Sequence, residues 1–179
     1  MEKVLVVFHS RSGYTRRVAQ ALARRLDADV EEVKVVQPMG GLVGYALCAI
    51  EAVTGLAPAL RPLAKDPANY DVVVIGTPVW FWSLSSPVRS WIESRGLRHN
   101  RVAFFCTMGG SGAKRVFATM AALTGRKPVA TLALTDAQVD RHVQGVLDEF
   151  AETLKTRHTA GGERAQRRRR TARTATAAA

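Results

Sequence analysis

The residues best suited to chemistry lie in three short segments, of which the first spans Phe8–Thr15 and reads FHSRSGYT. It brings two serines, a glycine and a threonine to the start of an expected helix. Backbone N–H groups, hydroxyls and the helix dipole together favour a bound phosphate at such a position. A well-capped helix without a ligand accounts equally well for the same residues. The segment is neither a Walker loop, because no Gly-Lys-Ser/Thr follows, nor a dinucleotide fingerprint, because three spaced glycines are missing.

The second segment, Gly76–Pro87, carries two of the three tryptophans of the chain beside a phenylalanine. A surface loop with three large aromatic side chains is expected to cover something. A flat aromatic ligand would be held there by stacking and by burial of its area. Packing against neighbouring helices, or a contact in a dimer, is the alternative.

The third segment, Thr107–Gly112, has three glycines in six residues. Glycines permit tight turns and let backbone N–H and C=O groups approach the edge of a ligand. A merely flexible connection is the alternative. Taken together, the three segments predict a site for a mononucleotide, with a terminal phosphate and a planar ring that is stacked and bonded along one edge.

The elements that must position these segments alternate between short apolar runs and longer amphipathic stretches, a pattern typical of an α/β fold with a parallel sheet. We expect five strands, at Val4–Phe8, Val30–Val36, Val72–Ile75, Val102–Cys106 and Val129–Leu134. Helices are expected at Thr15–Leu26, Pro87–Arg95, Ala113–Leu123 and Ala137–Lys155, the last capped by Thr135 or Asp136. Right-handed crossovers then predict a three-layer sandwich, whose ligands bind outside the carboxyl ends of the strands.

Two stretches fall outside this alternation. The connection Pro38–Asn69 is unusually long, and its centre, Leu42–Val53, has the spacing of a helix, either packed on the surface or closing over the site. Residues 159–179 contain Thr, Ala, Gly and Arg without apolar periodicity, so we expect disorder there. The expected organisation is one ligand-binding domain over residues 1–155 and a basic tail over residues 156–179.

The charge of the chain is concentrated in that tail. The 179 residues are 47% hydrophobic, enough for one domain with a sizeable core, which excludes a peptide hormone, a collagen-like rod and a fully disordered chain. Residues 155–179 hold eight basic residues and one acidic residue and carry +7 of the net +11, leaving +4 for the others. No specific nucleic-acid site is therefore expected, only weak contacts of the tail with anionic lipid or RNA that salt would weaken.

The remaining composition predicts a cytoplasmic protein without a transmembrane segment or a leader. Two cysteines, Cys48 and Cys106, are too few for a disulfide framework and fit a reducing compartment. We expect Cys106 to be a buried thiol at a strand end, Trp91 to be core, and the four histidines to form no metal site. His9 could move protons near a ligand.

Residues 6–22, which read VVFHSRSGYTRRVAQAL, resemble the signature of the flavodoxin family. Gly76–Trp80 is similar to the second flavin loop of that family and Thr107–Gly112 to the third, so the resemblance covers about residues 3–155. It implies a five-stranded parallel sheet of order 2-1-3-4-5 with helices on both faces, in a short-chain form, and noncovalently bound FMN.

The resemblance also implies roles for individual residues. The phosphate would be held by Ser10, Arg11, Ser12, Gly13, Tyr14 and Thr15. Thr77 and Pro78 would flank the ribityl chain, and the ring would stack on the segment that follows, which comprises Val79, Trp80, Phe81 and Trp82. Backbone groups would meet the pyrimidine edge at Thr107, Met108, Gly109, Gly110, Ser111 and Gly112. The flavin performs the redox step, so no catalytic side chain is assigned.

Two departures from electron-shuttle flavodoxins bear on function. Those proteins are markedly acidic, whereas residues 1–154 here carry +4. They also usually place a second aromatic residue after the fourth strand, and Thr107–Gly112 has none, which would leave one flavin face open to a hydride donor or a quinone.

Three hypotheses remain. The leading one is an FMN-binding redox protein that exchanges electrons with a partner protein. The second is an oxidoreductase that uses NAD(P)H or a quinone, similar to flavodoxin-fold quinone reductases or to a protoporphyrinogen-oxidase-like enzyme. The third is a non-redox module that binds a phosphate ligand. Association into a homodimer is compatible with each of them.

Overall fold

The computed structural model describes residues 2–36, 58–95, 97, 100–141 and 143–156. Strands and helices alternate along these residues, as the sequence predicts. The elements are β1 (Val4–Phe8), α1 (Tyr14–Leu26), β2 (Asp29–Glu32), the 3-10 helix η1 (Pro67–Asn69), β3 (Val72–Trp80), β4 (Ser83–Leu84), α3 (Ser86–Ser94), β5 (Arg101–Met108), α4 (Ala113–Thr124), β6 (Thr131–Thr135) and α5 (Asp136–Arg141). A further helix spans residues 144–156.

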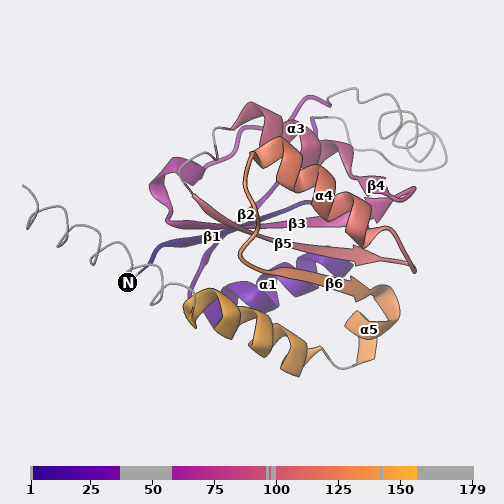
Figure 1. The fold of residues 1–179 in the computed structure, drawn as a ribbon. Coiled ribbons are helices and arrows are strands. Elements are labelled where there is room, and N and C mark those ends of the chain that lie inside the picture. The colour runs from indigo at the N-terminus through magenta and orange to yellow at the C-terminus, as the bar shows by residue number, and fades with distance from the viewer. Residues whose placement is uncertain (1, 37–57, 96, 98–99, 142, 157–179) are drawn as a thin grey trace, which may run out of the picture.

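The sheet has the order β2-β1-β3-β5-β6, and all neighbours along this path are parallel. The predicted five-stranded parallel sheet and its order are therefore confirmed. A sixth strand, β4, lies off the path and pairs antiparallel with the end of β3. Figure 1 shows α3 and α4 over one face of the sheet, and α1, α5 and the last helix over the other.

The central strands are buried on both faces, as expected for a parallel sheet between helical layers. Along β1, Val6 and Phe8 pack with α1 and the last helix, whereas Leu5 and Val7 pack with α3 and α4. Each strand thus contributes to two separate apolar clusters. The predicted core position of Trp91 is confirmed, because its side chain is fully buried on α3.

Strand boundaries differ from the prediction where pairing continues beyond the apolar run, or stops before it ends. β3 and β5 extend beyond the predicted Ile75 and Cys106, because their pairing continues to the Pro78–Thr107 pair. β2 ends at Glu32 rather than Val36, and Val35 instead forms an isolated antiparallel bridge with Leu60. Apolar content alone does not indicate where a partner strand ends.

The predicted helix Ala137–Lys155 is wrong as a single element. α5 ends at Arg141, Val143 is not helical, and a new helix begins at residue 144. Both helices pack on the same apolar cluster, so one continuous stripe in the sequence conceals the break. The predicted cap at Thr135 is confirmed: its hydroxyl accepts from Gln138 N–H at 3.2 Å, and the Gln138 side chain accepts from Thr135 N–H at 2.7 Å.

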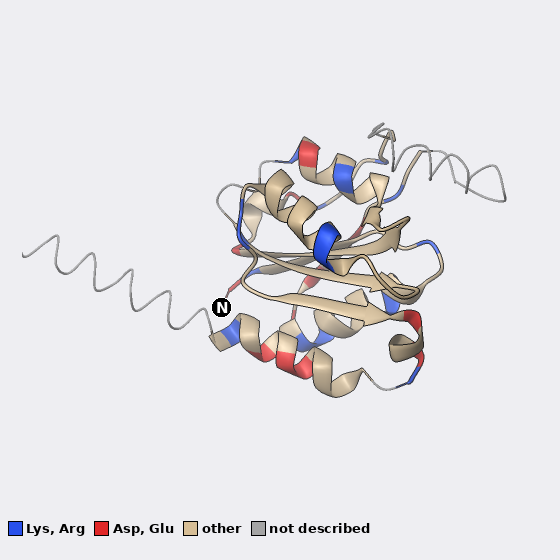
Figure 2. Cartoon of the chain, turned by 45° about the vertical axis from the view of Figure 1, so that its right-hand side comes forward, with Lys and Arg blue, Asp and Glu red and all other residues tan. Residues whose placement is uncertain are grey.

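Charged residues lie mostly on the helices and loops, while the strands carry few of them (Figure 2). Acidic and basic side chains are interspersed, and eight ion pairs join them among the described residues. None of the described helices is both long and apolar enough to cross a membrane. The predicted helix Leu42–Val53 and the tail from residue 159 lie outside the described residues.

Candidate functional site

The three segments of interest meet at one edge of the sheet because they follow neighbouring parallel strands. β1 pairs with β3 up to Phe8–Gly76, and β3 pairs with β5 through Pro78–Thr107. The carboxyl ends of β1, β3 and β5 therefore lie side by side, where open α/β sheets bind their ligands. We call this border of the sheet the carboxyl edge.

The first segment places an exposed helix N-terminus at the carboxyl edge. Gly13 is the N-cap of α1 with φ of 95°, a left-handed conformation that costs glycine little, and it supplies no side chain to the helix. The Ser10 hydroxyl accepts from Arg16 N–H at 3.2 Å. The first turn of α1 therefore presents N–H groups without a cap from Gly13, which suits the predicted phosphate.

The side chain of Tyr14 points away from that site. Its hydroxyl donates to Asp140 of α5 at 3.1 Å, and Arg17 pairs with the same carboxylate at 2.7 Å. These contacts fix the first turn of α1 against α5. Any part of Tyr14 in phosphate binding would therefore fall to its backbone N–H.

Two buried threonines join the first and third segments. The hydroxyls of Thr15 and Thr107 lie 2.8 Å apart, and one of them donates to the other. One of the two hydroxyl protons forms the hydrogen bond between Thr15 and Thr107. The other proton can therefore be donated to a further acceptor. A phosphate oxygen is such an acceptor.

The second segment is a hairpin rather than the loop that the sequence predicts. β3 runs to Trp80, Phe81 and Trp82 form a two-residue turn, and β4 returns antiparallel. Phe81 and Trp82 have φ of 47° and 57°, as a type I′ turn requires, although bulky residues rarely adopt this conformation. Their side chains are 44% and 61% exposed, and such strained, exposed aromatic residues cluster at ligand sites.

The remaining residues of the hairpin face the protein. The buried Thr77 hydroxyl lies 2.9 Å from both the Pro78 carbonyl and the Ser85 hydroxyl at the start of α3. Val79 packs against Gly112, where an added Cβ would come within 2.8 Å of its side chain. The side chains of Thr77 and Val79 thus support the hairpin. A ligand at this position would have to be bound by the backbone groups of the same residues.

The third segment begins with Thr107 and Met108, the last two residues of β5, and turns through glycines into α4. A Cβ added at Gly109 or Gly110 would meet no heavy atom within 4 Å, so both border open space. Ser111 accepts a hydrogen bond from the Trp82 indole N–H at 2.8 Å, which ties this segment to the hairpin. The structure thus brings all three predicted segments together.

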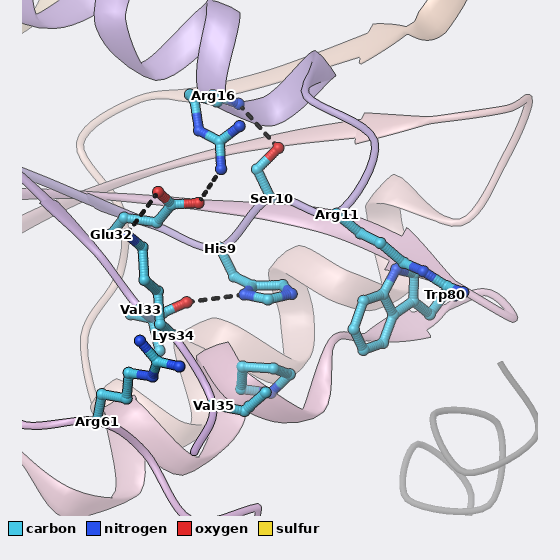
Figure 3. A pocket seen from close by; sticks show the side chains of 11 residues that line it. His9, Ser10, Arg11, Arg16, Glu32, Val33, Lys34, Val35, Arg61 and Trp80 are labelled. Atoms are coloured by element: carbon cyan, nitrogen blue, oxygen red, sulfur yellow. Dashed lines mark hydrogen bonds and ion pairs between the residues drawn. The ribbon is translucent and has the colours of Figure 1, made fainter. Parts of the chain in front are cut away.

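A cavity of about 280 Å³ opens beside the first segment, on the side of β2 (Figure 3). Of the predicted site residues it contains only Ser10, Arg11 and Trp80. His9, which the sequence predicts to lie near a ligand, also lines it. The other lining residues were missed: Arg16, Glu32, Val33, Lys34, Val35, Arg61 and Pro87. The signal that could have found Glu32 and Lys34 is their place at the carboxyl end of the second strand, at the same carboxyl edge.

The cavity wall holds a neutral histidine between charged groups. His9 Nδ1 donates to the Val33 carbonyl at 2.8 Å, and its ring packs edge-on against Trp80 with centroids 5.5 Å apart. Burial lowers the pKa of His9 below 6.5, opposed by the Val33 carbonyl and by Glu32. With Nδ1 as donor, Nε2 of the neutral ring is an acceptor.

The cysteine at the base of the site is buried. Cys106 is fully buried in β5, and burial raises the pKa of its thiol to about 12. The predicted burial of this thiol is confirmed, whereas its predicted place at the strand end is wrong, because β5 continues to Met108. Over the described residues, no group of three or more His, Cys, Asp and Glu is placed to hold a metal ion.

The carboxyl edge fits FMN in three respects. Backbone N–H groups at the start of α1, whose N-cap Gly13 has no side chain, are present for a phosphate, glycines without Cβ neighbours border open space, and exposed aromatic side chains stand beside them. The roles of individual residues toward FMN stay predictions.

Comparison with known proteins supports this fit. Residues 3–140 match the family of NADPH-dependent FMN reductases. The chain is 32% identical over 99 residues to an NAD(P)H dehydrogenase (quinone) of Cupriavidus metallidurans, covering 54% of this chain and 48% of that one. A second NAD(P)H dehydrogenase (quinone), of Nitrobacter winogradskyi, is 33% identical over 116 residues, covering 62% and 55%. The chain spans about half the length of the curated relatives it matches.

Solved structures agree on the fold. A flavoprotein of Lactobacillus acidophilus NCFM, crystallised in complex with FMN, superposes with a TM-score of 0.64 at 25% identity, covering 79% of this chain and 98% of that one. Flavodoxin 2 of Bacillus cereus superposes with a TM-score of 0.58 at 17% identity, covering 87% and 99%, which shows the shared fold alone.

Proposed function

The chain belongs to the NADPH-dependent FMN reductase family of flavodoxin-like proteins and binds FMN, and we propose that it transfers electrons from NAD(P)H through this FMN to a quinone. The quinone reductases among its relatives support this second hypothesis more than the leading one, a carrier that serves a partner protein. Those relatives are about twice as long as the region that matches this chain, so their substrates do not transfer to it directly. NAD(P)H and the quinone are therefore part of the proposal.

The observation that carries the proposal is the asymmetry of the ring site. Aromatic side chains stand on the hairpin, at Trp80, Phe81 and Trp82, whereas the third segment opposite has only small residues after Met108. Gly109 and Gly110 are exposed and border open space. A ring stacked on the hairpin would keep its other face accessible to the nicotinamide of a hydride donor, and then to a quinone.

The residues of the chain would bind and orient the cofactor. N–H groups at the start of α1, with the second proton of the Thr15–Thr107 pair, would hold the phosphate. Trp82, fixed by its bond to Ser111, would set the position of the ring. FMN supplies the capacity to accept a hydride and to pass on its electrons in one or two steps. The Nε2 atom of His9 can accept a proton, but His9 lines the cavity on the side of β2, so we assign it no part in hydride transfer.

The carrier hypothesis remains as the second candidate. It would be favoured by an acidic docking face, and the described surface instead intersperses both signs of charge (Figure 2). The non-redox phosphate module receives no support from the family and the relatives named above, which are flavoproteins or oxidoreductases.

A steady-state assay distinguishes these functions. FMN-loaded protein is mixed with NADPH or NADH and a benzoquinone, and oxidation of the nicotinamide is followed by its absorbance. We expect turnover that requires both bound FMN and the quinone, with protein stripped of FMN as the control. The proposal fails if neither nucleotide is oxidised while an added flavodoxin reductase still reduces the bound FMN, which is the behaviour of a carrier.

A further inference from the structure

We infer that the cavity beside β2 binds the phosphorylated adenosine half of NADPH, next to the FMN site. This inference rests on the proposed function and adds to it the position and the chemistry of a nucleotide subsite. The cavity is lined by the segment after β1, the start of α1, the end of β2 with the residues that follow it, Arg61 before β3, Trp80 of β3 and Pro87 of α3. Six of its eleven lining residues lie outside the three segments that fit FMN.

The size of the cavity limits what it can hold. Sites that enclose a drug-sized ligand usually measure about 300–1,000 Å³. With about 280 Å³, this cavity lies just below that range. It is large enough for a nucleoside carrying a phosphate and too small for an entire dinucleotide, whose other half would have to lie outside it.

The charge of the lining favours an anion. Four cationic side chains, of Arg11, Arg16, Lys34 and Arg61, surround one carboxylate, that of Glu32. Glu32 already pairs with Arg16 at 2.6 Å and with Lys34 at 3.8 Å. The exposed Arg61 guanidinium makes no ion pair or hydrogen bond to any described residue. The excess of positive charge is suited to a phosphate dianion.

The position of Glu32 favours a ribose. In doubly wound sheets an acidic residue at the end of the second strand, about 20 residues after the first loop, hydrogen-bonds the free ribose 2′-OH of NAD, or else a nearby arginine accommodates the 2′-phosphate of NADP. Here the Glu32 carboxylate is already paired with Arg16 and Lys34, and Arg61 is the arginine available to a phosphate. Glu32 is the last residue of β2 and lies beside Phe8 of β1. Arg61 and Lys34 come from two different segments on the same side of the cavity (Figure 3).

One wall of the cavity is aromatic and apolar. Trp80 and His9 pack edge to face there, and Val35 and Pro87 complete the wall. A purine can lie against such a surface. Trp80 belongs both to this wall and to the hairpin beside the FMN site, so a nucleotide held here would have its remaining half within the same edge of the sheet.

The subsite is tested by direct binding and by nucleotide preference. 2′,5′-ADP and 5′-AMP are titrated calorimetrically into FMN-loaded protein in a phosphate-free buffer. We expect 2′,5′-ADP to bind at least ten-fold more tightly, because only it carries the 2′-phosphate, and to leave FMN in place. Arg61→Ala and Lys34→Ala should each weaken 2′,5′-ADP about ten-fold, and should lower the ratio of kcat/KM for NADPH to that for NADH by a similar factor.

Arg24→Ala is the matched control, because it removes an exposed arginine near the far end of α1. It should change neither measurement. The inference is overturned if 2′,5′-ADP binds no better than 5′-AMP, if Arg61→Ala and Lys34→Ala behave as Arg24→Ala does, or if 2′,5′-ADP displaces FMN. The binding data are independent of turnover: a protein that oxidises NADPH but fails these tests refutes the subsite alone, and one that passes them without oxidising NADPH refutes the proposed function alone.

Discussion

The two halves of the carboxyl edge differ in chemistry although they belong to one sheet. The half over β3 and β5 is uncharged, with aromatic side chains on the hairpin and glycines opposite. The half over β1 and β2 carries four cationic groups around one carboxylate. One half can hold a flat ring and the other an anion. A single sheet edge therefore offers one place for the flavin ring and another for the phosphorylated part of the hydride donor.

The largest expected effect concerns the reactivity of Cys106, which is buried in β5 beneath the uncharged half. Burial raises the pKa of Cys106 from 9.0 to about 12, which lowers its thiolate fraction about 1,000-fold at neutral pH. In a Cys48→Ser background, we expect iodoacetamide to label Cys106 at least that much more slowly than the unfolded chain, as followed by mass spectrometry. Fast labelling that FMN blocks would show instead that the ring site reaches this thiol.

Gly112→Val should damage the uncharged half next most strongly. Gly112 has φ of 114°, and an added Cβ would lie 2.8 Å from Val79 and 3.0 Å from the Trp82 backbone. The strained backbone and the steric clash would both separate the hairpin from the third segment. We therefore expect FMN affinity to fall about 100-fold, which is roughly 2.7 kcal/mol of binding free energy. FMN fluorescence quenching measures the affinity and thermal unfolding checks the fold.

Gly145→Ala is the control for that change, because a Cβ at Gly145 would meet nothing within 4 Å. It should bind FMN as the wild type does. Equal affinity in Gly112→Val would contradict a ring site between the hairpin and the third segment.

Trp82→Ala should cost about ten-fold in FMN affinity, since stacking of a base on an aromatic side chain contributes roughly 1–3 kcal/mol. Trp82→Phe should recover most of this loss. Ser111→Ala removes only the partner of the indole N–H, and separates the contribution of the 2.8 Å hydrogen bond from that of stacking. If Trp82→Ala binds FMN as tightly as wild type, another residue of the hairpin holds the ring.

The smallest expected effect lies in the charged half, at His9. Its pKa is lowered by burial, so the unfolded chain takes up a proton first as the pH falls below 6.5. The stability that neutral His9 contributes is present above pH 6.5 and is lost as the pH falls toward its folded pKa. His9→Asn should therefore lose less thermal stability than the wild type between about pH 7.5 and pH 5. A parallel decline would show that His9 protonates freely in the fold.

The sequence predicted the uncharged half better than the charged half, for a physical reason. Clustered aromatic residues, as in Gly76–Pro87, and clustered glycines, as in Thr107–Gly112, stand out by composition, and strand order brings such segments together. Arg16, Glu32 and Arg61 come from a helix, a strand end and the long connection before β3, and no local pattern marks them as neighbours. The hairpin was missed because β4 is only two residues long and pairs through a turn of aromatic residues.

Anaerobic mixing of NADPH with the FMN-loaded protein, followed by the visible absorbance of the flavin, tests most directly whether the two halves act together. No quinone or partner protein is added. We expect the absorbance to bleach with one equivalent of NADPH per bound FMN, and a quinone added afterwards to restore it. Bound FMN that stays fully oxidised with excess NADPH and with excess NADH would contradict a hydride donor acting at this edge of the sheet.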